Sequence, residues 1–454
     1  MEIRDIVAAQ RAHFETGATR PLSFRIDALR RLYAAIRKHE PAIEAALAAD
    51  LGKHPHEAYL TEIGIVLAEI THTLRHLRRW SRPKRVPTPL PLFSASSRIV
   101  REPFGVVLVM SPWNYPFQLA VDPLVGAVAG GNCAVVKPGS YAPETAKAIA
   151  AVIAEAFSPE HVTTVLGGRE ENSRLLEEKF DYIFFTGSQA VGKTVMTAAA
   201  AHLTPVSLEL GGKSPCVLAP DADLKLAARR IAFGKTVNAG QTCVAPDYLL
   251  IREKEKPAFL AYYRAALQEF FGDDPLTNSE YPKIVNAKHH QRLRGLMQGM
   301  DQVIGGSWSE TRIAPTVLDG VTGADPVMQE EIFGPILPLI DYETDEQAIA
   351  FIRKRDRPLA FYLFTKDRSR ERRYLEELSF GGATVNDTLM HVASGELGFG
   401  GVGASGMGAY HGIHSYETFT HAKPILKRHN WVDLDVRYHP YTKRKGVVTR
   451  AMLK

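Results

Sequence analysis

Cys243 and Glu209 are the two side chains in this sequence best suited to covalent chemistry. Cys243 follows a flexible turn in residues 240–244, and Glu209 is flanked by apolar residues and glycines in residues 208–213. A thiolate is both a good nucleophile and a good leaving group. A carboxyl group in apolar surroundings has a raised pKa, which suits it to activate water. Taken singly, however, an isolated cysteine is more often structural, and Glu209 alone is an ordinary acid at a strand end.

A glycine loop at residues 187–194 offers a phosphate site. Its sequence, G-S-Q-A-V-G-K-T, matches the pattern G-x-x-x-x-G-K-[ST], and it follows a predicted strand and opens a predicted helix. Such a junction presents free N–H groups and a helix dipole to an anion. A nucleotide triphosphatase is therefore one interpretation, and a structural turn is another. No uninterrupted apolar strand ending in Asp follows, because Pro220 breaks residues 217–221. The loop is better interpreted as a dinucleotide phosphate site.

Short apolar runs alternate with helical stretches from Phe104 onward. The predicted buried strands are residues 105–110, 132–136, 162–166, 182–186, 216–219, 248–251, 336–340 and 360–364. Continuous apolar strands separated by helices indicate parallel sheets covered on both faces. Ligands bind at the carboxyl ends of such strands. The loops after these strands, including residues 111–116 with Asn114, are therefore expected to form the site.

The remaining parts of the chain predict helices, an arm and a basic tail. The first 80 residues show helical spacing, with a stop at residues 50–53, and residues 82–93 contain four prolines and must be extended. The last 32 residues carry nine Lys and Arg, and we interpret them as a solvated or interface surface rather than a nucleic-acid site.

Composition places the chain among ordinary enzymes. It has 454 residues, of which 45% are hydrophobic and 23% charged, so more than one domain is expected. No apolar run approaches the roughly 18–20 residues of a membrane span, and we expect no integral membrane segment. The three cysteines lack C-x-x-C spacing, which favours reduced thiols and a cytoplasmic location. No His and Cys cluster has ligand spacing, so no metal is expected.

Seven ordered segments together carry a resemblance. They read E-P-F-G-V-V-L-V-M-S-P-W-N-Y-P-F, G-G-N-C-A-V-V-K-P, F-F-T-G-S, L-E-L-G-G-K-S-P, G-Q-T-C-V-A-P-D-Y, E-E-I-F-G-P and F-G-G-V-G-A-S-G-M-G-A-Y-H-G. In this order, across nearly the whole chain, they resemble the aldehyde dehydrogenase superfamily. The likeness is closer to its class 3-like branch of fatty and aromatic aldehyde dehydrogenases.

The resemblance implies an α/β fold of three parts. A Rossmann-like parallel-sheet domain for NAD or NADP would comprise residues 1–82 and 104–209, and an α/β catalytic domain residues 210–395. Residues 83–103 and 396–454 would bridge and oligomerise, with the arm near 82–100 pairing with the tail near 425–445 as the β-structure of a homodimer.

The resemblance also implies a reaction. Cys243 would attack a small-molecule aldehyde, and the Asn114 side-chain amide with the Cys243 N–H would hold the developing oxyanion. Hydride transfer to the nicotinamide would leave a thioester, and Glu209 would activate the water that releases a carboxylic acid. The cofactor residues implied are Trp113, Lys137, Ser140, Thr186, Gly187, Ser188, Gly192, Glu331 and Phe333, and the substrate residues are Tyr115 and Thr242.

One departure from the family pattern concerns the cofactor. Members that use only NAD, and many class 3-like ones, carry a glutamate three residues after the ribose lysine, whereas this chain has Ser140 after Lys137. Serine removes the charge that repels a 2′-phosphate. We therefore expect that NADP is accepted, with Lys137 and Arg169 compensating its charge; a preference for NADP over NAD stays open.

Three competing functions are distinguishable by experiment. An acyl transferase passing the acyl group to CoA or phosphate would not need Glu209 as a base. A P-loop switch would turn over ATP or GTP without Cys243. A crystallin-like structural role would need none of Cys243, Glu209 and Asn114, and the presence of all three makes that role unnecessary.

Overall fold

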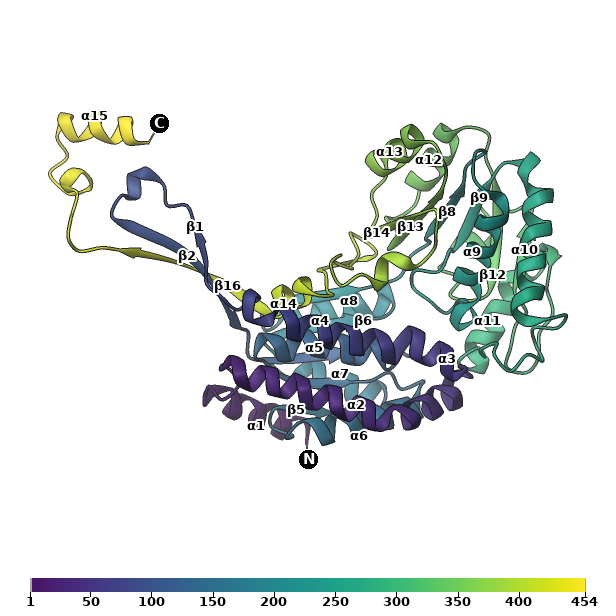
Figure 1. Cartoon of the computed structure of the whole chain (residues 1–454), viewed down its shortest axis with the longest axis horizontal. Helices are drawn as coiled ribbons and strands as arrows, with labels where there is room; N and C mark the ends of the chain where they lie inside the picture. Colours follow the sequence, from purple (N-terminus) through teal and green to yellow (C-terminus); the bar gives the residue numbers. More distant parts are fainter. Residues whose placement is uncertain (1, 454) are drawn as a thin grey trace.

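The computed structural model describes residues 2–453 as two α/β lobes with a protruding arm (Figure 1). A six-stranded sheet has the order β15-β7-β6-β3-β4-β5 and is parallel except where β15 pairs with β7. Its strands are β3 (Val106–Met110), β4 (Cys133–Lys137), β5 (Val162–Thr164), β6 (Tyr182–Thr186), β7 (Val206–Glu209) and β15 (Gly406–Met407). The parallel α/β class predicted from the apolar runs is confirmed.

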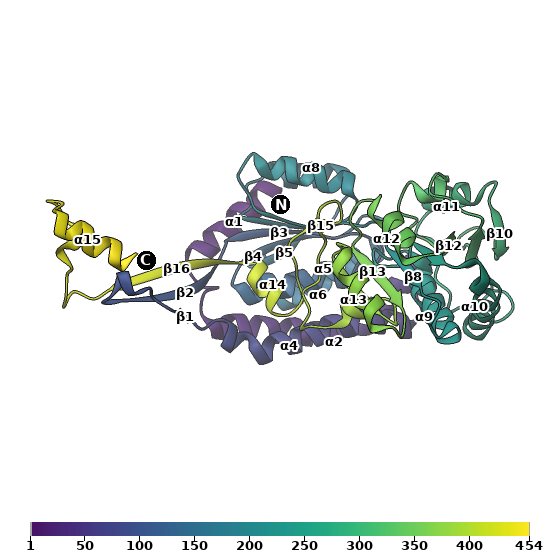
Figure 2. The same cartoon turned by 90° about the horizontal axis from the view of Figure 1, so that it is seen from above.

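Two helical layers enclose this first sheet, as Figure 2 shows from above. Alternate residues of β3 enter different cores, since Val106 and Leu108 pack in one cluster and Val107 and Val109 in another. The covering helices are α1 (Ile3–Glu15), α2 (Leu22–Leu51), α3 (Pro55–Ala58), α4 (Gly64–Trp80), α5 (Gln118–Gly130), α6 (Pro143–Ala156), α7 (Arg169–Glu177) and α8 (Gln189–Ala200). A π-turn, η1 (Tyr59–Ile63), interrupts the predicted helix before α4. The predicted stop of α2 is confirmed by Gly52, whose φ is 67°.

The second lobe contains a seven-stranded sheet. Its order is β10-β11-β12-β9-β8-β13-β14, and only β10 runs antiparallel to its neighbour. The strands are β8 (Pro215–Leu218), β9 (Tyr248–Ile251), β10 (Asp301–Ile304), β11 (Thr316–Asp319), β12 (Ile336–Asp341), β13 (Ala360–Phe364) and β14 (Gly382–Val385). The helices are α9 (Leu224–Thr236), α10 (Lys256–Phe271), α11 (Ala287–Met297), α12 (Asp345–Arg353) and α13 (Arg368–Glu377).

A three-stranded antiparallel sheet forms the arm, which extends away from both lobes (Figures 1 and 2). Its strands are β1 (Lys84–Val86), β2 (Ala95–Pro103) and β16 (Thr420–Arg428), and α14 (Ile413–Thr418) precedes β16. The predicted pairing of the proline-rich segment with the tail is observed, but its position was partly wrong. The paired tail residues are 420–428, and the chain beyond them ends in α15 (Lys443–Met452) because its sequence has helical spacing rather than strand alternation.

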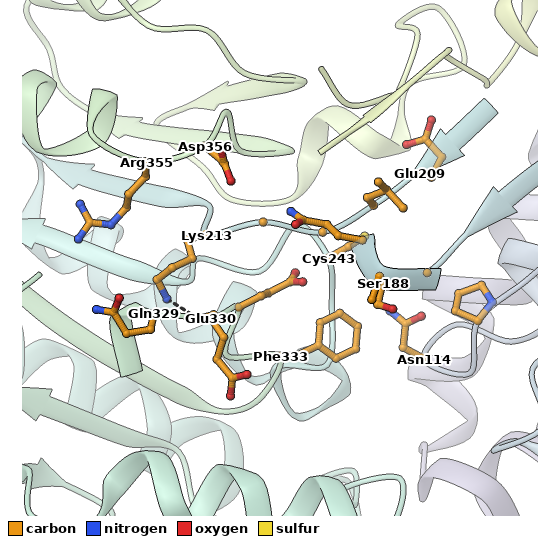
Figure 3. Close-up of a pocket in the computed structure, with 18 of the residues that line it drawn as sticks. Asn114, Ser188, Glu209, Lys213, Cys243, Gln329, Glu330, Phe333, Arg355 and Asp356 are labelled. Carbon is orange, nitrogen blue, oxygen red and sulfur yellow. Dashed lines mark hydrogen bonds between the residues drawn. The ribbon is translucent and has the colours of Figure 1, made fainter. Parts of the chain in front are cut away.

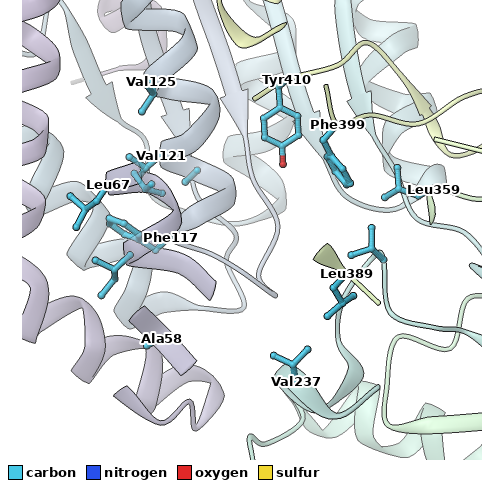
Figure 4. Packing of buried hydrophobic residues seen from close by; sticks show 14 of the residues in the cluster. Ala58, Leu67, Phe117, Val121, Val125, Val237, Leu359, Leu389, Phe399 and Tyr410 are labelled. Carbon is cyan, nitrogen blue, oxygen red and sulfur yellow. The ribbon is translucent and has the colours of Figure 1, made fainter. Parts of the chain in front are cut away.

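One hydrophobic core joins the two lobes. It extends from Leu67, Phe117 and Val121 in the first lobe to Val237 and Leu389 in the second (Figure 4). Within residues 2–453, no helix has both the length and the apolar character needed to cross a bilayer.

Asn132 ties this core to the base of the arm. Its side chain accepts from Gly105 N (3.0 Å) and donates to Ala127 O (3.0 Å) and Phe419 O (2.9 Å), with no solvent exposure. We predict that Asn132→Ala destabilises the fold by about 2–4 kcal/mol, because it leaves buried main-chain groups unpaired. Differential scanning calorimetry should show a midpoint of thermal unfolding several degrees below that of the unmodified protein. Asn278→Ala, which removes a half-buried contact to Phe271 O, should change it less, and equal shifts would contradict this account.

Candidate active site

A cavity of about 1160 Å³ lies between the two lobes at the carboxyl ends of the parallel strands. Figure 3 shows Asn114, Glu209 and Cys243 on one side of it and Lys213 and Glu330 farther along. Among the predicted site residues, those that line it are Trp113, Asn114, Thr186, Gly187, Ser188, Glu209, Cys243, Glu331 and Phe333. The fold therefore brings nine of the predicted site residues together at one cavity.

A strained turn presents Cys243. Asn238, Ala239 and Gly240 all have left-handed backbone angles, with φ of 51°, 51° and 71°. A Cβ atom at Gly240 would clash with the carbonyl of Gly334, so glycine is required there. Two consecutive non-glycine residues in this region cost roughly 1–3 kcal/mol each, and surrounding contacts must hold them.

The Cys243 thiol is in an environment that disfavours its charged form. Burial first, and then the carboxyl groups of Glu331 and Glu209, raise the pKa of Cys243 to about 12. Cys133 and Cys216 are buried too, and burial is also the main cause of their raised pKa values. The resting thiol of Cys243 is therefore protonated at neutral pH, and a base must take its proton during reaction.

Glu209 ends strand β7 and lies almost fully buried. Burial raises the pKa of Glu209 well above its ordinary value, as its apolar setting predicts. Neither carboxyl oxygen has a hydrogen-bond partner among residues 2–453. A buried carboxyl group with both oxygens free, facing a cavity, can hold and activate a water molecule.

Asn114 bridges the two lobes. Its Nδ2 donates to Gln241 O at 3.0 Å, only two residues before the thiol. An amide nitrogen has two protons, so a second proton remains available to an oxyanion formed on a carbonyl attacked by Cys243.

The glycine loop has the features of a dinucleotide site. Ser188 caps α8, with its side chain accepting from Val191 N, and the buried hydroxyl of Thr186 has no partner among residues 2–453. Gly192 packs so closely on Leu210 that a Cβ would lie 2.8 Å from it. Free N–H groups at the start of α8 face the cavity and fit a pyrophosphate. Lys193, by contrast, is exposed and does not line the cavity, which disfavours the P-loop interpretation.

Phe333 and Glu331 form the opposite wall. Phe333 has a left-handed φ of 51° and meets Trp113 edge-on, with ring centres 5.4 Å apart. Burial raises the pKa of Glu331 to about 8, with Asp247 contributing. The Glu331 carboxyl lies against Gly211, where no side chain would fit.

Five predicted residues do not line this cavity, and Gly192 of the glycine loop is one of them. The Lys137 amine donates to Pro138 O (2.9 Å) and Gly167 O (2.7 Å), and Ser140 is exposed nearby. Tyr115 and Thr242 are buried and bond to each other through their hydroxyl oxygens at 2.6 Å. These positions neither test nor exclude the roles expected of them.

Sequence reasoning missed several supporting residues. Lys213 donates to the Val327 and Glu330 carbonyl groups (both 2.9 Å) and pairs with Asp247, which accepts from Ile332 N (2.9 Å). Lys213 and Asp247 lie inside two of the recognised segments, which is the signal that could have found them. They fix the loop that carries Glu331.

A half-buried thiol and an unpartnered carboxyl group lie beside a dinucleotide-type turn, at the strand ends of an α/β fold. This combination is typical of an oxidoreductase. The pattern of the Aldehyde dehydrogenase family matches residues 1–425. The chain belongs to this family, and it is an aldehyde dehydrogenase.

Individual relatives agree. "Aldehyde dehydrogenase family 3 member B1" of Bos taurus is 46% identical, over 97% of this chain and 95% of its own. "Aldehyde dehydrogenase, dimeric NADP-preferring" of Canis lupus familiaris is 43% identical, over 97% of this chain and 98% of its own. The solved structure of a substrate-bound AldH of Staphylococcus aureus has a TM-score of 0.98 and 45% identity, covering 100% of both chains. The predicted class 3-like resemblance is confirmed.

The raised pKa of Cys243 predicts slow labelling of the cofactor-free protein. Iodoacetamide reacts with the thiolate, whose fraction falls about tenfold for each pH unit below the pKa. The labelling rate should therefore keep rising above pH 9, the ordinary thiol value. Intact mass, with Cys243→Ser as the unlabelled control, measures it. A plateau at or below pH 9 would show that the thiol is not desolvated.

Proposed function

We propose that the protein oxidises aldehydes to carboxylic acids with NAD or NADP, through a thiohemiacetal and then a thioester on Cys243. The observation that carries this proposal is the unpartnered, buried carboxyl group of Glu209 in the same cavity as the thiol. A base that activates water is needed for hydrolysis, whereas transfer to CoA or phosphate needs none.

The thiol can be activated by passing its proton to a neighbouring carboxylate, because the number of negative charges in the site then stays the same. Burial disfavours each negative group, and the Glu209 carboxyl further raises the pKa of Cys243. When the proton passes from the thiol to an ionised Glu209, the site keeps a single negative charge, so transfer avoids burying a second one. The thiolate sulfur then bonds to the aldehyde carbon, and the carbonyl oxygen becomes an oxyanion held by Asn114 and the Cys243 N–H.

The pyrophosphate of the dinucleotide would be held by Thr186, Gly187, Ser188 and the first turn of α8. The nicotinamide ribose would be held by Glu331. A bound dinucleotide would supply the hydride acceptor for the thiohemiacetal carbon. Glu209 first releases to solvent the proton that it took from the thiol, which leaves it ionised again. It then takes a proton from water, the resulting hydroxide adds to the thioester carbon, and the sulfur leaves as the thiolate. Tyr115 and Thr242 would form the wall of the aldehyde site.

Replacing Glu209 tests the hydrolytic step. Glu209→Gln keeps the shape but cannot accept a proton, so the thioester should accumulate and steady-state turnover should fall by about 10²–10⁴. Intact mass after mixing with hexanal and NAD or NADP should show one added acyl group. Glu170→Gln, an exposed change on α7, is the matched control. Normal turnover with no adduct would remove Glu209 from the mechanism.

We further propose that NADP is accepted as a cofactor beside NAD. Ser140 puts no carboxylate after Lys137, and the canine relative is named NADP-preferring. Arg169 opens α7 beside the Gly167 turn that Lys137 contacts, and it would add charge for a 2′-phosphate.

Restoring the carboxylate tests the cofactor proposal. Ser140→Glu should shift the ratio of kcat/KM for NAD over NADP by at least roughly tenfold, equivalent to about 1.4 kcal/mol, through repulsion of the 2′-phosphate. Ser140→Gln matches its size without its charge and should shift the ratio less. An NAD preference above about a hundredfold in the unmodified protein would contradict the proposal.

A homodimer built through the arm is also proposed. The arm leaves Leu90, Phe93 and Trp431 exposed, and an apolar surface of this kind calls for a partner. The canine relative is named dimeric.

A further inference from the structure

A fully buried ion pair lies next to the oxyanion residue. Lys53 Nζ and Glu62 Oε1 are 2.5 Å apart, and both side chains have 0% exposure. Lys53 follows the end of α2, and Glu62 lies in the π-turn η1. Short π-helical segments such as η1 are frequent at functional sites. Neither residue belongs to the catalytic groups described above.

Lys53 contacts the segment that carries the Asn114 amide. Its Nζ donates to Asn114 O at 3.3 Å and lies 4.1 Å from the centre of the Tyr115 ring. Lys53 contacts the main chain of Asn114. By fixing the position of this main chain, the contact also fixes the position from which the Asn114 side chain extends.

Glu62 holds the same segment from its other end. Its Oε2 accepts from Phe117 N at 2.8 Å and from Gln118 N at 3.2 Å. Both N–H groups belong to the start of α5, where they have no acceptor within the helix. Residues 114–118 are therefore fixed at both ends by one ion pair.

The second lobe also contacts the main-chain carbonyl group of Asn114. Asn238 Nδ2 donates to Asn114 O (2.7 Å) and to Gln241 O (3.1 Å), while Glu57 Oε1 accepts from Asn238 N (2.9 Å). Asn114 O thus accepts hydrogen bonds from Lys53 in one lobe and from Asn238 in the turn before Cys243. One carbonyl links the oxyanion residue to the nucleophile turn.

We propose that Lys53 and Glu62 are positioning residues for the reaction: they fix the main chain at Asn114 and so aim its amide at the carbonyl attacked by Cys243. The inference rests on the proposed function of Asn114 and Cys243. Stability alone does not explain the pair, because buried ion pairs can often be replaced by apolar residues without loss of stability. A displacement of about 1 Å at reacting groups can cost 10² in rate.

A double-mutant cycle with Asn114 separates positioning from general support. The variants are Lys53→Met, Glu62→Gln, Asn114→Ala and the two doubles that combine Asn114→Ala with each. If the pair acts through the Asn114 amide, each single change should lower kcat/KM for hexanal at least about tenfold. In the Asn114→Ala background the same changes should cost less than about twofold, since the amide they aim is gone.

Controls make each outcome decisive. Lys38→Met on α2, which removes an exposed 2.8 Å pair with Glu155 on α6, should leave kcat/KM unchanged. Glu62→Gln keeps shape and volume and carries the test if Lys53→Met fails to fold. Equal losses in both backgrounds, or no loss in either, would overturn the inference. An unmodified protein inactive with every aldehyde, or a fully active Asn114→Ala, would instead contradict the proposed function.

Discussion

Burial of ionisable groups is the constraint on which this site depends. The pKa values of Cys243, Glu209 and Glu331 are all raised, with desolvation as the largest cause in each case. Burial of this kind disfavours a second negative charge beside the first, so these groups do not readily ionise together. Proton transfer between groups of the site therefore keeps its total charge constant. The N–H donors of the site are left to stabilise the charge that develops on the substrate.

To keep these groups away from water, the loops of the two lobes must stay together at the boundary between the lobes, which we call the seam. The loop before Cys243 is held in a left-handed turn, and Asn238 in that turn is bonded to Glu57 and to Asn114 O. Strain in the turn is offset by these contacts across the seam. The same contacts bring the thiol and the amide from different lobes to one cavity, so the fold itself assembles the proposed catalytic pair.

Much of the fold and site could be predicted from sequence because their signals are local. The strands β3, β4, β6 and β13 appear as uninterrupted apolar runs, and Cys243, Glu209 and Asn114 lie in ordered segments typical of the family. The glycine loop shows the limit of a local pattern. It matches a P-loop letter for letter, yet the decisive feature, the exposure of Lys193, is set by tertiary structure.

Other features depend on contacts between distant parts of the chain. Lys53 meets Asn114 across 61 residues, and Asn238 meets it across 124, with no periodicity that announces either contact. The register of the arm was predicted only approximately, because strand β16 pairs with a segment more than 300 residues earlier. The left-handed angle at Ala239 is likewise imposed by packing, because alanine does not favour it, whereas asparagine at position 238 tolerates it.

The most direct test of the account is the rate of nicotinamide reduction by Cys243→Ser compared with the unmodified protein, measured by absorbance with an aldehyde and either cofactor. A hydroxyl group is a far weaker nucleophile than a thiolate at this position. The account predicts a loss of at least about 10³ in rate, with the fold intact by thermal unfolding. A Cys243→Ser protein that keeps a tenth or more of the rate would contradict the thiohemiacetal route at its first step.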